Sequence, residues 1–400
     1  MSLLKTVCIT IVCLSCFACR SIRNEEMASQ PFLIKPEVLI ANKQKIESGD
    51  IKWKNALSLL IAEAEKTMSN EPYSVTFKMK TPPSGDKHDY MSVGPYWWPD
   101  PSKPDGLPYI RKDGEINPER YEIQDAEFFK DLCKDVWVLS LAAFYTDNEK
   151  YAAKAANLLR TWFIDEATLM NPNLNYGQAI PGHTDGRGIG LIDTRGIVNL
   201  IDGIQILKNS ASLTTNDYES LQNWFARYLE WMTTSPVGLD EADEHNNHGT
   251  YYDLQTVSIA LFIHQAERAA QILEEQTKPR IESQFAGDGS QPHELARTLS
   301  WGYSLMNLEG FFGLASLAEN TTIDLWNYVS PGGKSIKKAY LWMLPYAKDE
   351  VVWTYQQIKP INKSGFTDLS RIAILKYPEK DISSYLAISQ DANFLFTLTH

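Results

Sequence analysis

Apolar residues recur through most of the chain at the spacing of one helix face. In one stretch, after the candidate cap residues Thr215 and Asn216, apolar side chains fall at i, i+3, i+4, i+7, i+8 and i+11. These positions are Leu221, Trp224, Phe225, Tyr228, Leu229 and Met232. Residues with this spacing share one side of an α-helix, so we expect all six to face the core.

The same spacing predicts further helices. They cover residues 36–69, 127–144, 148–163, 195–209, 251–273, 297–318 and 334–346. Strand-like alternation is scarce before the C-terminal third, so we expect an all-α body of antiparallel helix pairs. No low-complexity tract or long linker divides residues 19–400, which we expect to form one domain.

Long polar segments, rich in Gly, Pro, Asn and aromatic residues, separate these helices. They cover residues 71–125, 171–194, 234–250 and 281–296. Loops of this length are uncommon in a folded domain unless they carry function. The candidate chemistry is therefore expected there.

The N-terminal segment indicates export. Lys5 precedes an apolar stretch over residues 7–18 that is too short to span a bilayer, which predicts a signal peptide over residues 1–18. The end of this segment resembles a bacterial lipobox in which Cys19 receives the lipid, with a soluble periplasmic protein as the alternative. We therefore expect a location in the periplasm, or on the outer membrane of a Gram-negative bacterium through a lipid on Cys19. Cys133 is the one cysteine beyond this segment, which excludes an intrachain disulfide and a cysteine metal site.

The overall charge limits the partners. The chain has 38 Lys and Arg against 50 Asp and Glu, a net charge of -12, which argues against a nucleic-acid partner. A polyanion would need a local basic cleft, for which the candidates are Lys87, Arg111, Arg187, Arg195 and Arg297. The 11 Trp and 19 Tyr exceed what a core of this size needs. Flat aromatic rings can stack on sugar faces, as well as fill cores.

An aromatic loop is the first candidate for substrate binding. Tyr96, Trp97 and Trp98 stand between two prolines, which favours a rigid platform for a sugar ring. Lys87 and His88 belong to the same segment and are further candidates for contacts with an anionic substrate. The alternative is a loop that its aromatic residues pin to the body.

The segment 171–195 is the second candidate. Asn175 and Gln178 offer the donors and acceptors that sugar hydroxyls need, and Arg187 can bind a carboxylate through two hydrogen bonds. His183 lies between them and completes the expected set. Turn formation explains some of the Asn residues equally well.

Two further segments each precede or enter a predicted helix. Asn247 and His248 stand just before a long apolar stretch, and Tyr252, four residues after His248, would share its helix face. Arg297 and Tyr303 are six residues apart and would point about 120° away from each other on a helix. They meet at one substrate only if Arg297 precedes the regular helix or reaches in from its edge.

Taken together, these segments resemble the alginate lyase family of bacterial polysaccharide lyases. The resemblance covers about residues 85–345, and its motifs in chain order are DYMSVGPYWWPDP, GLPYIRKDGEINPE, NPNLNYGQAIPG, GRGIGLIDTR, NNHGTYYD and QPHELARTLSWGY. It implies an (α/α) toroid, an incomplete barrel of helix pairs with the substrate cleft at one end. It also implies catalytic roles for the Asn247-His248 pair, for Arg297 and for Tyr303.

The reaction implied by the resemblance is β-elimination at a 4-linked uronic acid. Amide, imidazole and guanidinium groups would neutralise the carboxylate, so that the weakly acidic C5 proton can be removed. Tyr303 would be base and acid at mannuronate, helped by cationic neighbours that lower its pKa. At the opposite C5 configuration, His248 or His183 would be the base.

Our reading is therefore an alginate lyase that needs no cofactor. No metal-ligand spacing such as HExxH occurs in the chain. Three alternatives remain: a lyase of glucuronan or another polyuronate, a glycoside hydrolase on the same barrel, and a non-catalytic glycan-binding lipoprotein. A hydrolase needs two carboxylates beside the scissile bond, for which the candidates are Asp185, Asp193, Glu244 and Glu294.

Overall fold

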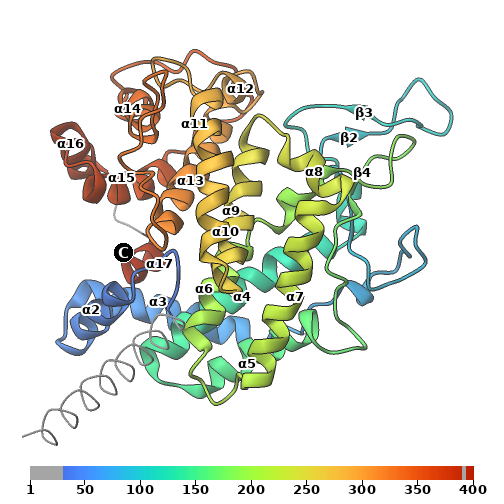
Figure 1. The fold of residues 1–400 in the computed structure, drawn as a ribbon, viewed down its shortest axis with the longest axis horizontal. Coiled ribbons are helices and arrows are strands. Elements are labelled where there is room, and N and C mark those ends of the chain that lie inside the picture. The colour runs from blue at the N-terminus through green and yellow to red at the C-terminus, as the bar shows by residue number, and fades with distance from the viewer. Residues whose placement is uncertain (1–29, 390–392) are drawn as a thin grey trace, which may run out of the picture.

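Helices in an inner and an outer layer form most of the described chain, which is residues 30–389 and 393–400 of a computed structural model (Figure 1). The expected signal segment and Cys19 lie outside these residues. Among the described helices, none has the length and apolar character needed to cross a membrane.

The inner layer is made of four long helices. They are α4 (Asp125–Thr146), α6 (Ile197–Leu207), α9 (Asn247–Phe262) and α13 (Ser300–Ala318). Neighbours in this order pack against one another: α4 against α6, α6 against α9, and α9 against α13. Buried residues occur on every side of α9, as expected for a helix that is covered all round.

The outer helices alternate with the inner ones along the chain. They are α3 (Ile51–Met68), α5 (Glu149–Phe163), α7 (Thr215–Thr234), α10 (Ala266–Ile272), α11 (Lys278–Gln284) and α14 (Ile336–Ala347). In α7 the six predicted apolar residues are all buried, which confirms the stripe. Its N-cap is Thr214, one residue before the expected candidates, in a capping box with Asp217.

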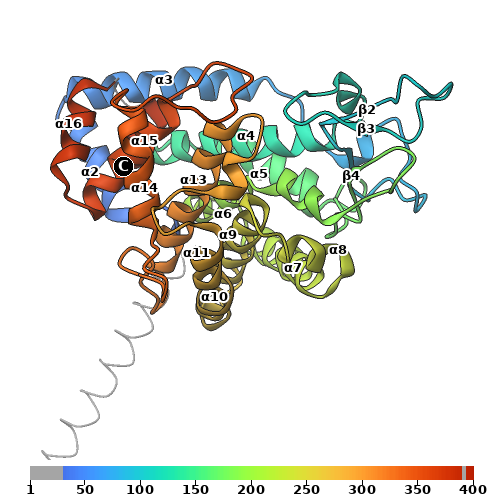
Figure 2. The ribbon, with the colours of Figure 1, turned by 90° about the horizontal axis from the view of Figure 1, so that it is seen from above.

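The two ends of the described chain lie together, at the side away from the strands (Figures 1 and 2). The helices there are α2 (Pro36–Glu47), α15 (Ser364–Lys376), α16 (Lys380–Ile388) and α17 (Phe394–Thr399). The last of them packs against α2 and α3.

Inner and outer helices together form an incomplete (α/α) toroid, which confirms the predicted all-α class.

The long polar segments contain short strands and short helices. Strand β1 (Met91–Val93) pairs in parallel with β4 (Tyr176–Ala179), and β2 (Trp97–Trp98) pairs antiparallel with β3 (Ile110–Arg111). These segments also hold η1 (Val75–Phe77), η2 (Pro118–Glu122), η3 (Gly188–Thr194), α8 (Pro236–Ala242) and α12 (Pro292–Leu295). Strands β2, β3 and β4 gather with α8 at one end of the molecule (Figures 1 and 2).

Two predicted helices are interrupted. The expected helix 36–69 breaks between α2 and α3, where Gly49 has a φ of 94° and Asp50 caps the next helix. The expected helix 251–273 begins four residues earlier, at Asn247, and breaks before α10, where His264 has a φ of 60°. The five residues after α10, Leu273–Thr277, form a π-helix, η4.

Candidate active site

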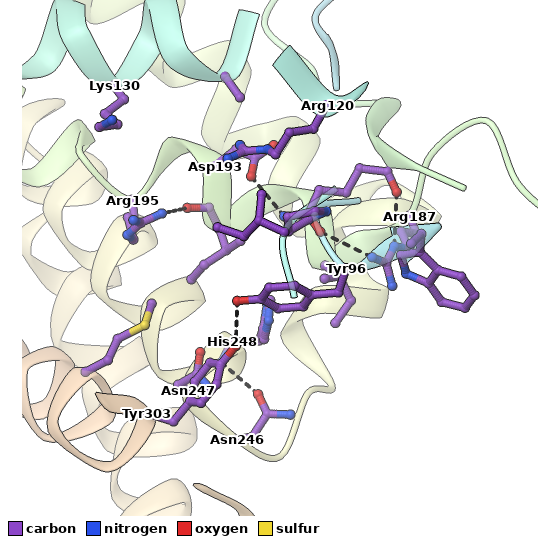
Figure 3. A pocket seen from close by; sticks show the side chains of 18 of the residues that line it. Tyr96, Arg120, Lys130, Arg187, Asp193, Arg195, Asn246, Asn247, His248 and Tyr303 are labelled. Carbon is purple, nitrogen blue, oxygen red and sulfur yellow. Dashed lines mark hydrogen bonds between the residues drawn. The ribbon is translucent and has the colours of Figure 1, made fainter. Parts of the chain in front are cut away.

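A cavity of about 710 Å³ opens at the end of the molecule that carries the strands. It lies between the loops of β2 to β4, η3 and the N-termini of α9 and α13. Eight of the predicted site residues line it: Tyr96, Trp97, Gln178, Arg187, Asn247, His248, Arg297 and Tyr303. Segments more than 200 residues apart in the chain thus meet in one pocket, as Tyr96 and Tyr303 show (Figure 3).

The N-terminus of α9 presents Asn247 and His248 to the pocket. Asn246 is the N-cap, and its side chain accepts a hydrogen bond from the backbone N–H of His248. The backbone N–H of Asn247 donates to Glu294 Oε1 at 2.7 Å, and its amide Nδ2 donates to both Glu294 oxygens at 3.1 and 2.9 Å. Glu294 therefore fixes the orientation of the Asn247 side chain.

His248 has a buried carboxylate partner. Its Nδ1 lies 2.8 Å from Glu241 Oε1, and the Glu241 side chain is 1% exposed. Burial lowers the pKa of His248, but the charge and the hydrogen bond of Glu241 outweigh it, so this pKa lies above its ordinary value. Burial also disfavours the charged form of Glu241, which raises the pKa of its carboxyl to about 7. Because Nδ1 is engaged, Nε2 is the ring nitrogen left to face a substrate.

Tyr303 lies between Tyr96 and Arg297. The two tyrosine hydroxyls are 2.8 Å apart, and the Arg297 guanidinium lies 3.7 Å from the centre of the Tyr303 ring. Helix α13 begins at Ser300, so Arg297 precedes the regular helix, which is one of the two ways in which we expected these residues to meet.

Arg297 is itself held by an acidic residue. Its Nε and Nη2 donate to the two oxygens of Asp113 at 3.2 and 2.7 Å. Arg111 and Thr298 bind the same carboxylate. Burial chiefly raises the pKa of Tyr303 above its ordinary value, Tyr96 adds to the rise, and Arg297 opposes it only in part. Cationic neighbours alone were expected to lower this pKa, and burial reverses the net direction.

Arg187 lines the pocket beside Trp97. Its Nε donates to the backbone carbonyl of Gln178 at 3.0 Å and its Nη2 to Gln178 Oε1 at 3.2 Å. The amide of Gln178 donates in turn to Asp193 Oδ1 at 2.9 Å. Gln178 is thus engaged in holding Arg187, while Arg187 remains at the pocket surface. Gly94 permits this packing, because a Cβ there would lie 2.7 Å from Trp97 and 3.0 Å from Arg187.

Six predicted residues lie outside the pocket lining, each with another partner. Tyr252 is 2% exposed and donates to the Met232 carbonyl, since this face of α9 packs against α7 and α8. Lys87 donates to the carbonyl of Lys78, and His88 Nδ1 lies 2.6 Å from the carbonyl of Leu169. The His88 contact attaches the loop 78–90 to the body, and the Lys87 contact lies within this loop.

The other three also have partners outside the pocket lining. Trp98 donates to the carbonyl of Glu115, which matches the alternative of a loop pinned by its aromatic residues. Asn175 accepts a hydrogen bond from the Trp231 indole, and His183 Nε2 lies 3.0 Å from the carbonyl of Tyr109. The His183 ring lies behind Trp97, at 5.5 Å between centres.

Two of the four hydrolase candidates, Asp193 and Glu244, line the pocket. Asp193 accepts hydrogen bonds from Tyr90, Ser92 and Gln178, and Glu294 is occupied by Asn247. Asp185 is exposed and outside the pocket lining, and Glu244 lines the pocket. The described residues contain no group of three or more His, Cys, Asp or Glu arranged to hold a metal ion.

Sequence reasoning missed the two carboxylates that orient the site, Glu241 and Asp113. Glu241 is seven residues before His248, in the separate helix α8, and no pattern marks it. Asp113 precedes Gly114 and looks like an ordinary turn residue. Only the fold brings these groups to their partners.

The alginate lyase family model matches residues 74–353 of this chain. A search of curated protein sequences gave no match. Among solved structures, an alginate lyase from Bacteroides ovatus is 39% identical, with 92% of this chain and 98% of that chain covered and a TM-score of 0.88.

Alginate lyase A1-III from Sphingomonas species A1 is 16% identical, with 93% of this chain and 95% of that chain covered and a TM-score of 0.59. A histidine-to-alanine variant of A1-III, complexed with a tetrasaccharide, matches over the same shares with a TM-score of 0.61. At this identity the A1-III structures support the fold alone. The family model and the Bacteroides structure together show that this chain belongs to the alginate lyase family and is a polysaccharide lyase.

Proposed function

We propose that this protein cleaves alginate, the chain of mannuronate and guluronate, by β-elimination and leaves 4,5-unsaturated uronate ends. The observation that carries the proposal is the grouping of a phenol, an imidazole, a carboxamide and a guanidinium in one pocket: Tyr303, His248, Asn247 and Arg187. These are the groups that a uronate elimination requires.

The first requirement is neutralisation of the carboxylate beside C5. While that carboxylate keeps its full charge, the C5 proton is too weakly acidic to be removed, so donors must stabilise the enolate-like intermediate. The raised pKa of His248 favours its protonated form, which supplies a cation for this purpose. Arg187 is the further donor at the pocket surface, and Asn247 lines the pocket with its amide held by Glu294.

The second requirement is a base for the C5 proton and an acid for the C4 oxygen. Tyr303 keeps its proton in the resting pocket because burial raises its pKa, which suits the acid role. For the base role the phenolate must form, and Arg297 and the Tyr96 hydroxyl are the groups that stabilise it. On mannuronate, Tyr303 fills both roles in turn on one face of the sugar.

Guluronate has the opposite configuration at C5, so its proton faces the other side of the ring. His248 is the base that we propose there, acting in its neutral form through Nε2. Of the two histidines considered from sequence, His248 lines the pocket and His183 does not.

The deciding experiment is product analysis on alginate. A lyase yields an ultraviolet-absorbing unsaturated uronate, a hydrolase yields only reducing ends, and a binding protein yields neither. Parallel digests of polymannuronate, polyguluronate and glucuronan identify the preferred polymer. Reducing ends without ultraviolet absorbance on all three polymers contradict the proposal.

We also propose export, with a lipid on Cys19 that holds the enzyme at the outer membrane. Cell fractionation of the wild type and of Cys19→Ala tests this proposal. We expect the wild type in the outer-membrane fraction and the variant in the soluble periplasmic fraction, and equal distribution of the two contradicts the anchor.

A further inference from the structure

The pocket continues past the groups described above. The lining residues to which the proposed reaction gives no role are here called the far half of the pocket: Ile116, Arg120, Tyr121, Lys130, Arg195 and Met306. In Figure 3, Arg195 and Lys130 lie on the opposite side of the Tyr96–Tyr303 hydrogen bond from Arg187. Cations therefore flank the candidate catalytic groups on both sides.

Positive charge exceeds negative charge in this far half. Arg120 and Lys130 both pair with Glu127, at 3.2 and 3.0 Å. Arg195 donates to the carbonyl of Ile192 at 3.0 Å, and among the described residues no carboxylate forms an ion pair with it. Two acidic residues of the lining, Glu127 and Asp193, thus face three cations, in a chain whose net charge is -12.

Rigid elements hold two of these cations in place. Lys130 lies on the second turn of the inner helix α4, and Arg195 joins η3 to the start of the inner helix α6, which packs against α4. A cation beside a helix N-terminus is unfavourable for that helix, so Arg195 does not serve the stability of α6. Most of its guanidinium donors remain available to a planar anion such as a carboxylate.

An exposed apolar surface adjoins the cations. The Tyr121 side chain is 48% exposed and that of Ile116 is 43% exposed, and both line the pocket. The Arg120 guanidinium lies 5.1 Å from the centre of the Tyr121 ring. An exposed tyrosine beside cations that outnumber the nearby carboxylates is a combination that binds a charged sugar, because the ring packs on the sugar face while the cations meet the carboxylate.

We propose that Arg195, Lys130 and Tyr121 form an outer subsite for a uronate residue of the bound polymer, across the catalytic groups from Arg187 and Trp97. The inference rests on the proposed function, because it takes the substrate to be a polyuronate. A chain that fills both halves of the pocket presents an internal bond to Tyr303. The outer subsite therefore favours long chains over short oligomers.

The test compares a double variant, Arg195→Gln with Lys130→Gln, with a matched control, Arg227→Gln with Lys380→Gln. Both control residues are exposed and lie outside the pocket lining, and the change in net charge is the same. On long alginate chains we expect the KM of the double variant to rise about tenfold or more, with kcat within about twofold of wild type. On the shortest oligomers that are cleaved, we expect its KM to stay close to that of wild type. Tyr121→Ala should weaken long-chain binding in the same direction.

A binding measurement separates this inference from the proposed reaction. Calorimetry measures the affinity for alginate oligosaccharides of increasing length. The protein carries Tyr303→Phe, so that binding is measured without turnover. We expect affinity to increase with length in this background and to lose most of that increase when Arg195 and Lys130 are replaced. The outer subsite is overturned if the double variant matches the control, or if its KM rises equally for short and long chains. Absence of unsaturated product from the wild type contradicts the proposed function instead, while the length dependence of binding still decides the subsite.

Discussion

The buried carboxylate of Glu241 holds the imidazole of His248, with 2.8 Å between Oε1 and Nδ1. Glu241 comes from α8 and His248 from the first turn of α9, so the contact joins two consecutive helices across a short turn. It orients the imidazole and stabilises its protonated form. The two groups titrate together because each changes the charge that the other faces.

Replacing Glu241 by Gln should shift the pH dependence of guluronate cleavage. His248 must be neutral to act as the base, so activity rises as the pH passes through its pKa, which Glu241 raises above its ordinary value. Loss of that negative charge lowers this pKa, because an opposite charge at contact distance favours the protonated imidazole. We therefore expect the acidic limb of kcat on polyguluronate to move to lower pH.

Glu230→Gln, at an exposed position on α7, is the matched control and should leave the profile in place. An acidic limb that stays where it is in Glu241→Gln, with the fold intact by circular dichroism, would show that His248 is not the titrating base.

Loss of the Tyr303 hydroxyl should abolish turnover while the protein still binds oligosaccharide. Acid–base groups contribute roughly a hundred- to ten-thousand-fold in rate, and in Tyr303→Phe both roles at mannuronate are lost together. Tyr96→Phe removes only the hydrogen bond to the Tyr303 hydroxyl, so we expect a smaller fall in kcat. Rates on polymannuronate and calorimetric affinities for its oligomers measure the two effects. Wild-type elimination by Tyr303→Phe would remove this residue from the mechanism.

The helices were predictable because each buries a periodic stripe, as Leu221 to Met232 do in α7. The break after α2 was missed, although Gly49 followed by Asp50 is a sequence signal for a helix end and a new helix start. The break at His264 has no such signal, because a left-handed backbone at a histidine is not apparent from the sequence.

Site residues were predictable where a motif enters an inner helix, as with His248 and Tyr303. Such residues lie at the end of the toroid because the helix that follows them is fixed in the core. Residues within the long loops were harder to predict. Lys87 and Asn175 lie in polar sequence of the right composition, yet Lys87 binds a carbonyl of its own loop and Asn175 binds Trp231 of α7. The spacing of polar residues along a loop does not predict which of them form hydrogen bonds within the protein and which remain available to a substrate.

The stability of the loop around the site should depend on Lys78. Its Nζ lies 2.9 Å from Asp125 Oδ2, with both side chains fully buried, and it also donates to the carbonyls of Val75, Lys87 and Asp89. Lys78→Met leaves the Asp125 carboxylate buried without its partner, which costs about 3 to 5 kcal/mol. Urea unfolding at neutral pH measures this loss.

Lys80→Met breaks the exposed pair with Glu122 and should cost less than about 1 kcal/mol. Burial raises the pKa of Asp125 to about 6 although Lys78 opposes the rise, so this pKa rises further in Lys78→Met, and protonation in acid removes the unpaired charge. The destabilisation in Lys78→Met should therefore be smaller in acid than at alkaline pH. Equal losses at both pH values would contradict the charge explanation.

Activity should survive exhaustive chelation. Acid, base and carboxylate-neutralising roles are each assigned to a side chain of the pocket, so the proposed reaction requires no metal ion. Initial rates on alginate before and after dialysis against a chelator measure this. Loss of activity that returns on addition of zinc or calcium would contradict the assignment.

Substrate binding should weaken as salt increases. A chain of net charge -12 holds a polyanion only through a local excess of cations, and Arg111, Arg187 and Arg195 line the pocket. Attraction over distance is screened beyond about 8 to 10 Å at moderate ionic strength, so KM on alginate should rise with salt. Neutralisation at contact distance is screened less, so kcat should change less. A KM that does not depend on salt would favour a neutral glycan as the substrate.

The two arginines nearest the reaction should respond differently to substitution. Arg187 lies at the pocket surface, fixed by Gln178 and free to meet a substrate carboxylate, so Arg187→Ala should mainly raise KM. Arg297 is engaged by Asp113 and lies 3.7 Å from the centre of the Tyr303 ring, where its charge favours the phenolate. Arg297→Ala should therefore mainly lower kcat, because removing that charge raises the pKa of Tyr303 further. The split between KM and kcat on polymannuronate distinguishes the roles. If Arg297→Ala raises KM and leaves kcat unchanged, then Arg297 binds substrate and does not act through Tyr303.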